Sequence, residues 1–124
     1  MAQTRGQLEA EISQLLIKFA KEHLGRGPEE AKTHIFEDVI FVRLFGVLTS
    51  AEKHLAREAD GARLIKEMRL RLMESSREPL GDLMVERIGC KVVSLHTDLS
   101  VRTGEEIIVF ILDRNLEQVL CDRS

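Results

Sequence analysis

Two stretches of this chain are apolar on both sides of an extended strand, and this constrains its fold more than any other feature of the sequence. Residues 39–45 read Val-Ile-Phe-Val-Arg-Leu-Phe, and residues 105–112 read Glu-Glu-Ile-Ile-Val-Phe-Ile-Leu. Successive side chains of a strand point to opposite sides of a sheet. A sheet built from these two stretches therefore needs apolar cover on both of its faces.

Helical and strand-like segments alternate along the chain. A first helix is predicted at Leu8–His23 from apolar positions spaced by three and four residues, which are Leu8, Ile12, Leu15, Leu16 and Phe19. The loop Gly25-Arg26-Gly27-Pro28 ends this helix. Residues 31–45 then predict a hairpin that turns at Glu37-Asp38, and a single long strand with a bulge is the alternative.

A middle helical region follows this hairpin. Thr49 and Glu52 form a capping box, in which each side chain bonds the other residue's backbone amide, so we assign both residues a structural role at a helix start. This helix is expected to run to about Glu58. A longer helix, ended by Pro79, is expected to turn its apolar side chains inward, namely Leu64, Ile65, Met68, Leu72 and Met73. A last helical segment at residues 80–88 is capped by Gly89.

Residues 91–99 and 105–112 predict a second hairpin, with Gly104 at the turn position that requires positive φ. The element order is therefore helix, hairpin, helices, hairpin. This order predicts an α+β fold of two layers, with a four-stranded, mainly antiparallel sheet and helices on one face. We expect one domain over residues 1–124, with loosely ordered ends at residues 1–6 and 117–124.

One helical layer covers only one of the two apolar sheet faces. The simplest cover for the second face is another copy of the chain, so the sequence predicts a homodimer through the sheet. The alternative is a monomer whose helices divide between the two faces.

Composition excludes several classes of protein. There are 18 Lys and Arg against 21 Asp and Glu, and Tyr and Trp are absent, so no nucleic-acid partner is expected. No apolar run is long enough to span a membrane and the N-terminal residues are polar, so we expect a soluble, cytoplasmic protein. Cys90 and Cys121 lack metal-ligand spacing and are interpreted as reduced thiols. We expect no metal and no cofactor.

His96 and Asp98 form the most suggestive pair of polar residues. They lie two positions apart on a predicted strand, so both side chains leave the same face. A carboxylate beside an imidazole suits a general base, a metal ligand or an anion site, and the alternative is a solvent-facing strand end. Ser94 shares that face, but a spacing of about 6.6 Å between alternate strand residues argues against a hydrolase triad.

Two arginines are further ligand candidates. Arg43 interrupts an apolar strand, where it either pairs with an acidic residue such as Asp98 or Glu37, or binds a small anion beside His96. Arg26 lies between two glycines, which suits an anion loop or an ordinary helix end. Arg63, Lys66 and Arg69 share a helical stripe that we interpret as solvent-facing.

Three segments together resemble the MpsC-like bacterial domain family. They are the Gly25–Pro28 loop, residues 41–53, and residues 92–100 with Thr103-Gly104-Glu105, and the likeness extends over Leu8 to Leu116. The resemblance implies an association with a sodium-translocating, membrane-potential-generating system linked to bicarbonate uptake, and it supplies no catalytic residues. The leading hypothesis is a homodimeric regulatory module that binds a small anion such as bicarbonate, or a partner protein. The alternatives are an enzyme that uses His96 with Asp98 and a purely structural interaction module.

Overall fold

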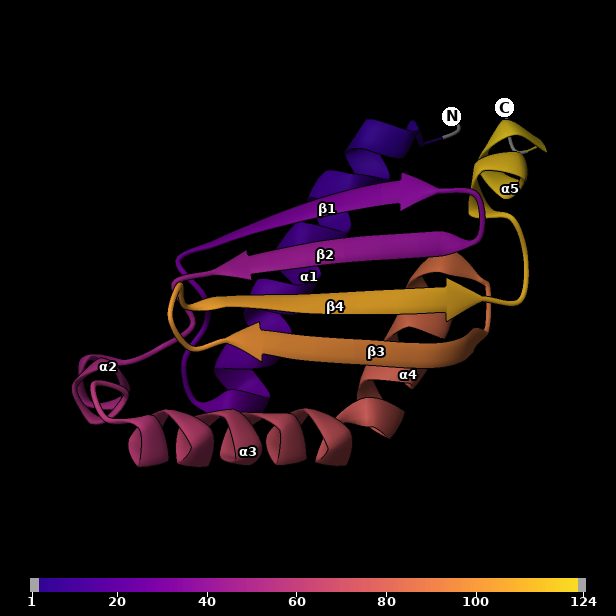
Figure 1. Cartoon of the computed structure of the whole chain (residues 1–124). Coiled ribbons are helices and arrows are strands. Elements are labelled where there is room, and N and C mark those ends of the chain that lie inside the picture. The colour runs from indigo at the N-terminus through magenta and orange to yellow at the C-terminus, as the bar shows by residue number, and fades with distance from the viewer. Residues whose placement is uncertain (1–2, 123–124) are drawn as a thin grey trace.

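The computed structural model describes residues 3–122 as a four-stranded sheet with five helices (Figure 1). The helices are α1 (Arg5–Leu24), α2 (Ser50–Leu55), α3 (Ala59–Ser75), α4 (Arg77–Ile88) and α5 (Leu116–Asp122). The strands are β1 (Glu30–Phe36), β2 (Val39–Phe45), β3 (Val92–Ser100) and β4 (Glu105–Leu112). This arrangement confirms the predicted α+β class.

The strand order is β1-β2-β4-β3, and every neighbouring pair is antiparallel. The two strands of each predicted hairpin pair with each other, β1 with β2 and β3 with β4. The two hairpins join where β2 pairs with β4. The helices pack on one side of the sheet, with α1 behind its middle and α3 along the outer edge of β3 (Figure 1). The core side chains of the two central strands are each 3% exposed or less, namely Ile40, Val42, Leu44, Ile108, Phe110 and Leu112.

The first turn is a two-residue connection, which confirms the hairpin over the single bulged strand. Glu37 adopts a φ of 53°, an uncommon left-handed conformation for a residue other than glycine. The carbonyls of Glu37 and Asp38 accept hydrogen bonds from the amides of Leu116 and Leu112, at 2.8 Å each. This turn therefore fixes the chain that leads into α5.

Helices reach into both of the segments that we expected to be loosely ordered. At the N-terminus, Thr4 and Gln7 form a capping box that starts α1 at Arg5. Near the C-terminus, residues 116–122 form α5, so residues 117–122 of the expected tail are helical. Leu116 and Leu120 of this helix are buried in the core. Of the two ends expected to be loose, residues 1–2 and 123–124 lie outside the described residues.

The inward face of α3 was predicted incorrectly in part. Ile65 and Met73 are buried, but Leu64, Met68 and Leu72 are 59%, 44% and 37% exposed. The buried row is spaced by four residues and comprises Gly61, Ile65, Arg69 and Met73. Because α3 lies at the edge of the sheet, only this narrow row contacts the core. Pro79 lies in the first turn of α4, where its missing N–H is tolerated, so the helix break falls before it.

Gly61 should be intolerant of alanine although it is helical. A Cβ at this position would lie 2.0 Å from the carbonyl oxygen of Leu55, so α2 and α3 would have to separate. We expect Gly61→Ala to destabilise the fold by about 2 kcal/mol, as overpacking does. Gly81→Ala in α4 is the matched control, since nothing would lie within 4 Å of the added Cβ and alanine favours helix by about 1 kcal/mol relative to glycine. Urea unfolding measures both, and equal stabilisation by the two changes would contradict the close approach.

Candidate functional site

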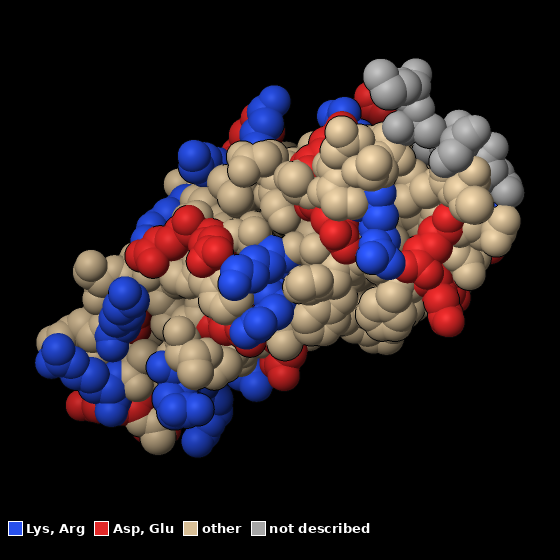
Figure 2. Space-filling view, turned by 90° about the horizontal axis from the view of Figure 1, so that it is seen from above, with Lys and Arg blue, Asp and Glu red and all other residues tan. Residues whose placement is uncertain are grey.

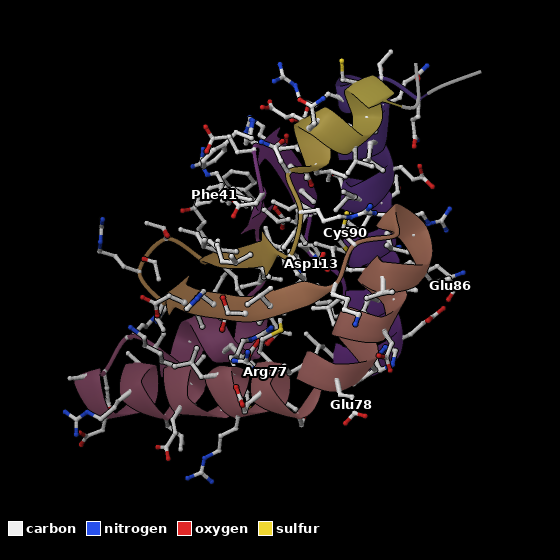
Figure 3. The ribbon with its side chains drawn as sticks, turned by 90° about the vertical axis from the view of Figure 1, so that its right-hand side faces the viewer. Phe41, Arg77, Glu78, Glu86, Cys90 and Asp113 are labelled. Atoms are coloured by element: carbon white, nitrogen blue, oxygen red, sulfur yellow. The ribbon has the colours of Figure 1, made fainter. Side chains whose placement is uncertain are left out.

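The side of the sheet opposite the helices carries no covering element within residues 3–122. We call it the open sheet face. It consists of Glu30, Lys32, His34 and Phe36 of β1, Val39, Phe41, Arg43 and Phe45 of β2, Glu105, Ile107, Val109 and Ile111 of β4, and Ser94, His96, Asp98 and Ser100 of β3. Figure 3 views the sheet from its end and shows Phe41 projecting away from the helical layer. The second apolar face that the sequence predicted is therefore present, and none of the described residues forms a layer over it.

The open sheet face is mainly apolar along β2 and β4, apart from Arg43 and Glu105, and mainly polar along its two outer strands, apart from Phe36. Its central side chains are partly exposed hydrophobic residues, with Phe41 and Val109 as cross-strand partners. At the edges, Phe41 is flanked by His34 on β1, and Val109 is flanked by His96 on β3. An apolar strip framed by polar residues is typical of an interaction surface.

Arg43 pairs with an acidic residue, and that residue is Glu105. The guanidinium donates from Nη2 and Nε to Glu105 Oε2, at 2.6 and 3.0 Å, and its centre lies 4.8 Å from the ring centre of Phe45. The partner is neither Asp98 nor Glu37, the two acidic residues named from the sequence. The pairing engages the positive charge that an anion site would need.

His96 and Asp98 share the open sheet face but do not bond each other in the described contacts. His96 Nε2 lies 3.2 Å from Ser94 Oγ, so the imidazole spans the strand spacing that we expected to keep these two residues apart. Asp98 instead accepts from the Leu99 amide at 2.8 Å and lies 3.2 Å from Lys66 Nζ. The Leu99 amide first, and then Lys66, lower the pKa of Asp98.

This geometry lacks the parts of a hydrolase triad. A triad needs the carboxylate to orient the imidazole, whereas Asp98 bonds Leu99 and Lys66. His96 is also exposed to solvent. A hollow between α4 and the start of β3 includes Ser94 in its lining, but neither His96 nor Asp98.

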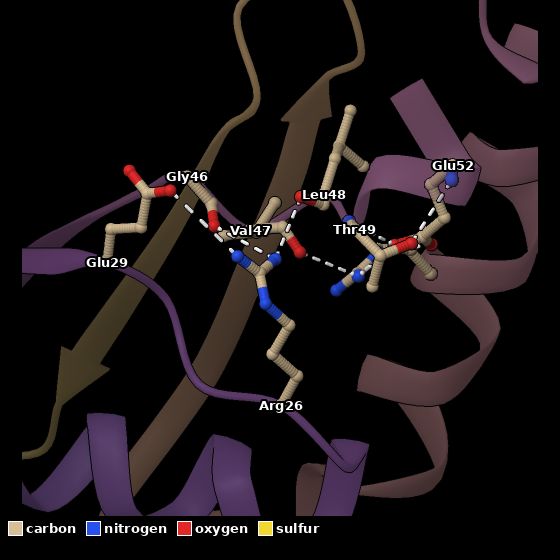
Figure 4. A network of polar contacts seen from close by, with 8 residues as sticks. Arg26, Glu29, Gly46, Val47, Leu48, Thr49 and Glu52 are labelled. Carbon is tan, nitrogen blue, oxygen red and sulfur yellow. Dashed lines mark hydrogen bonds and ion pairs between the residues drawn. The ribbon is translucent and has the colours of Figure 1, made fainter. Parts of the chain in front are cut away.

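Arg26 lies away from the open sheet face and holds the loop after β2 (Figure 4). Its Nη1 donates to the carbonyls of Leu48 and Gly46 at 2.8 and 3.3 Å, and its Nη2 lies 3.9 Å from Glu29. Gly25 has a φ of 83°, as a left-handed helix C-cap does. The Gly-Arg-Gly segment therefore ends α1 and places a guanidinium against backbone carbonyls.

The predicted capping box of α2 is present. Thr49 Oγ1 accepts from the Glu52 amide at 3.1 Å, and Glu52 Oε1 accepts from the Thr49 amide at 2.9 Å. The same carboxylate receives two bonds from Arg69, at 2.7 and 3.1 Å. Burial alone would raise the pKa of Glu52, but the bonds from Arg69 and Thr49 outweigh it and lower the pKa.

Arg69 is buried, which contradicts the solvent-facing stripe predicted from the sequence. Only 9% of the residue is exposed, and Nη2 also donates to the Val47 carbonyl at 2.7 Å. Its stripe neighbours Arg63 and Lys66 have more exposed side chains, at 78% and 44%. Arg69 therefore ties α3 to the loop that Arg26 holds from the other side.

Glu106 is the buried acid that the sequence analysis missed. It lies on the core side of β4, between its cross-strand partners Leu44 and Leu99, and is 2% exposed. Burial raises its pKa to about 7, against the opposing positive charge of Arg69. Strand alternation could have shown this placement, because Glu106 shares its face with Ile108 and Phe110.

Of the candidate residues, the fold brings Arg43, His96 and Asp98 to one sheet face and leaves Arg26 elsewhere. Within residues 3–122, no three His, Cys, Asp or Glu side chains converge as they would around a metal ion. Cys90 and Cys121 are both free thiols. None of the helices in the described part of the chain is both long and apolar enough to cross a membrane.

Comparison with known proteins relates nearly the whole chain to one family. A family model described as "Na+-translocating membrane potential-generating system (MpsC)" matches residues 4–114. The uncharacterized protein YbcI of Bacillus subtilis (strain 168) is 43% identical over 124 residues, which cover 97% of this chain and 100% of YbcI. The uncharacterized protein YrhF of the same organism is 30% identical over 111 residues, which cover 87% of this chain and 89% of YrhF. No solved structure matches.

Proposed function

Since this chain belongs to the MpsC family and both relatives are uncharacterized, we propose its function from its own surface: it is a homodimeric binding module, regulatory rather than catalytic, whose open sheet face binds a second copy. The observation that carries the proposal is the uncovered apolar strip of β2 and β4, which includes Phe41 and Val109. Covering such a strip removes apolar surface from water, which is the main driving force of association.

The charges of the open sheet face favour a second copy as its partner. Arg43 is paired with Glu105, Asp98 with Lys66, and Lys32 lies 4.0 Å from Glu30, so each charge is matched within one chain. Figure 2, a view from above, shows side chains of both signs on the side that faces the viewer, with basic side chains gathered toward the end where α2 lies. Two copies can therefore stack without the repulsion that a face of single sign would cause.

The catalytic and anion-binding hypotheses have less support. The carboxylate that an acid–base pair would need has other partners, because Asp98 accepts from the Leu99 amide and lies beside Lys66. The guanidinium of Arg43 bonds Glu105, and that of Arg26 bonds backbone carbonyls. Sensing of an anion such as bicarbonate stays a hypothesis about this module, and the interface is the function we propose.

Substitution of a central residue of the strip should separate the dimer. We expect the unmodified chain to sediment at about twice its 14.1 kDa mass, and Val109→Lys to weaken association about tenfold or more, because it buries an unpaired ammonium in each copy. Sedimentation velocity over a range of concentrations measures this shift.

Val93→Lys is the matched control. Val93 is also an exposed strand valine, at 66%, but it lines the hollow beside α4 and lies outside the open sheet face. This variant should remain dimeric. A 14.1 kDa species for the unmodified chain at every concentration would refute the proposed dimer.

A further inference from the structure

The open sheet face differs between its two ends along the strands. The end beside the β1–β2 turn is apolar, and its cross-strand pairs are Val39–Ile111 and Phe41–Val109. The other end holds the ion pair of Arg43 with Glu105, whose side chains are 42% and 22% exposed. This gradient restricts how two copies can stack face to face.

When two sheets stack face to face with their strands aligned, the two-fold axis runs either across the strands or along them. An axis across the strands turns the polar end of one copy onto the apolar end of the other. The ion pair of Arg43 with Glu105 would then be buried against Val39 and Ile111, and such desolvation is costly. An axis along the strands places apolar rows on apolar rows and the ion pair on its own symmetry mate.

We propose that the dimer axis runs along the strands, between β2 and β4, so that β1 of each copy faces β3 of the other. This inference rests on the proposed dimer and specifies its geometry. Arg43 of one copy then lies beside Glu105 of the second, and each guanidinium is shared by two carboxylates. At the edges, His34 of one copy lies opposite His96 of the other, because both residues occupy the same cross-strand row.

Cysteine cross-linking between two single variants tests this geometry. His34→Cys and His96→Cys are each made in a Cys121→Ser background, because Cys121 is exposed and Cys90 is buried. Stacked sheets lie about 10 Å apart, so a bismaleimide that spans this distance is the reagent. Each variant is first checked by sedimentation, and then the two are cross-linked separately and as a mixture.

We expect covalent dimers from the mixture, and we expect no cross-linked product when either variant is used alone. Cross-linking of either variant with itself would overturn the proposed axis, because strand β1 or β3 would then face its own copy. Dimers that cross-link in none of the three samples would also overturn it. Failure of the proposed dimer itself is distinguishable, because the unmodified chain would then sediment as a monomer.

A second measurement uses the unmodified chain, so it does not depend on the cysteine variants. A carbodiimide couples a lysine to a carboxylate in direct contact, and the proposed axis places Lys32 of one copy over Asp98 of the other. In a mixture of ¹⁴N and ¹⁵N chains, mass spectrometry should find mixed-isotope Lys32–Asp98 peptides. The Lys66–Asp98 pair within one chain is the internal control, since its atoms lie 3.2 Å apart. If the Lys66–Asp98 peptide forms but no mixed-isotope Lys32–Asp98 peptide is found, the proposed axis along the strands is contradicted.

Discussion

Glu106→Gln should stabilise the protein by about 3 kcal/mol at pH 8 and change its stability little at pH 4. The pKa of Glu106 is about 7 in the folded chain against 4.5 for an ordinary glutamate, and one pKa unit corresponds to about 1.4 kcal/mol. Between pH 4.5 and pH 7 the unfolded chain has released the proton of Glu106, whereas the folded chain keeps it. The wild type therefore loses stability as the pH rises from 4.5 to 7, and the glutamine variant lacks this loss.

Urea unfolding at pH 4, 6 and 8 measures the effect. Glu86→Gln is the control, because Glu86 is exposed on α4 and projects from the helix in Figure 3, and such a surface change is expected to stay within about 0.5 kcal/mol. If Glu106→Gln destabilised the fold at pH 8, the ionised carboxylate would have to be a stabilising partner of Arg69. That outcome would reverse the sign of the prediction.

The strands were predictable because their signal is local. Alternation in residues 39–45 and 105–112 assigned each side chain to a face, and the faces that the helices cover are the ones with Val42 and Phe110. Glu106 follows from the same rule. The open sheet face was predictable too, because both sides of these strands are apolar while the chain has few helices to cover them.

The orientation of α3 was less predictable because two rows of side chains, one that begins at Leu64 and one that includes Ile65, both have helical spacing. Leu64 and Met68 lie about 100° around the helix from Ile65 and Arg69, and only tertiary contacts decide which row is buried. The sequence favoured burial of leucine and methionine over burial of arginine. The fold buries Arg69 because the Val47 carbonyl and the Glu52 carboxylate lie where its guanidinium can bond both. Neither partner is near Arg69 in sequence.

Arg69→Met should cost about 3–5 kcal/mol, the usual loss when one partner of a buried ion pair is removed. The change leaves the Glu52 carboxylate and the Val47 carbonyl without the bonds that Arg69 donates. Arg71→Met is the matched control on the same helix. The guanidinium of Arg71 bonds Glu67, and the Arg71 side chain is 80% exposed. The expected loss of folding stability is therefore about 0.5 kcal/mol or less. Equal costs for the two variants would contradict the buried role of Arg69.

The cost of losing Arg69 should also depend on Glu106. The positive charge of Arg69 opposes the burial that raises the pKa of Glu106, so its removal should raise that pKa further. At pH 8 the Arg69→Met change should therefore cost less in a Glu106→Gln background, where no buried negative charge is left uncompensated. At pH 4 the two backgrounds should agree, because Glu106 is then protonated and uncharged in the folded chain whether or not Arg69 is present. A double-mutant cycle at these two pH values measures the coupling, and additivity at pH 8 would mean that Glu106 and Arg69 do not interact.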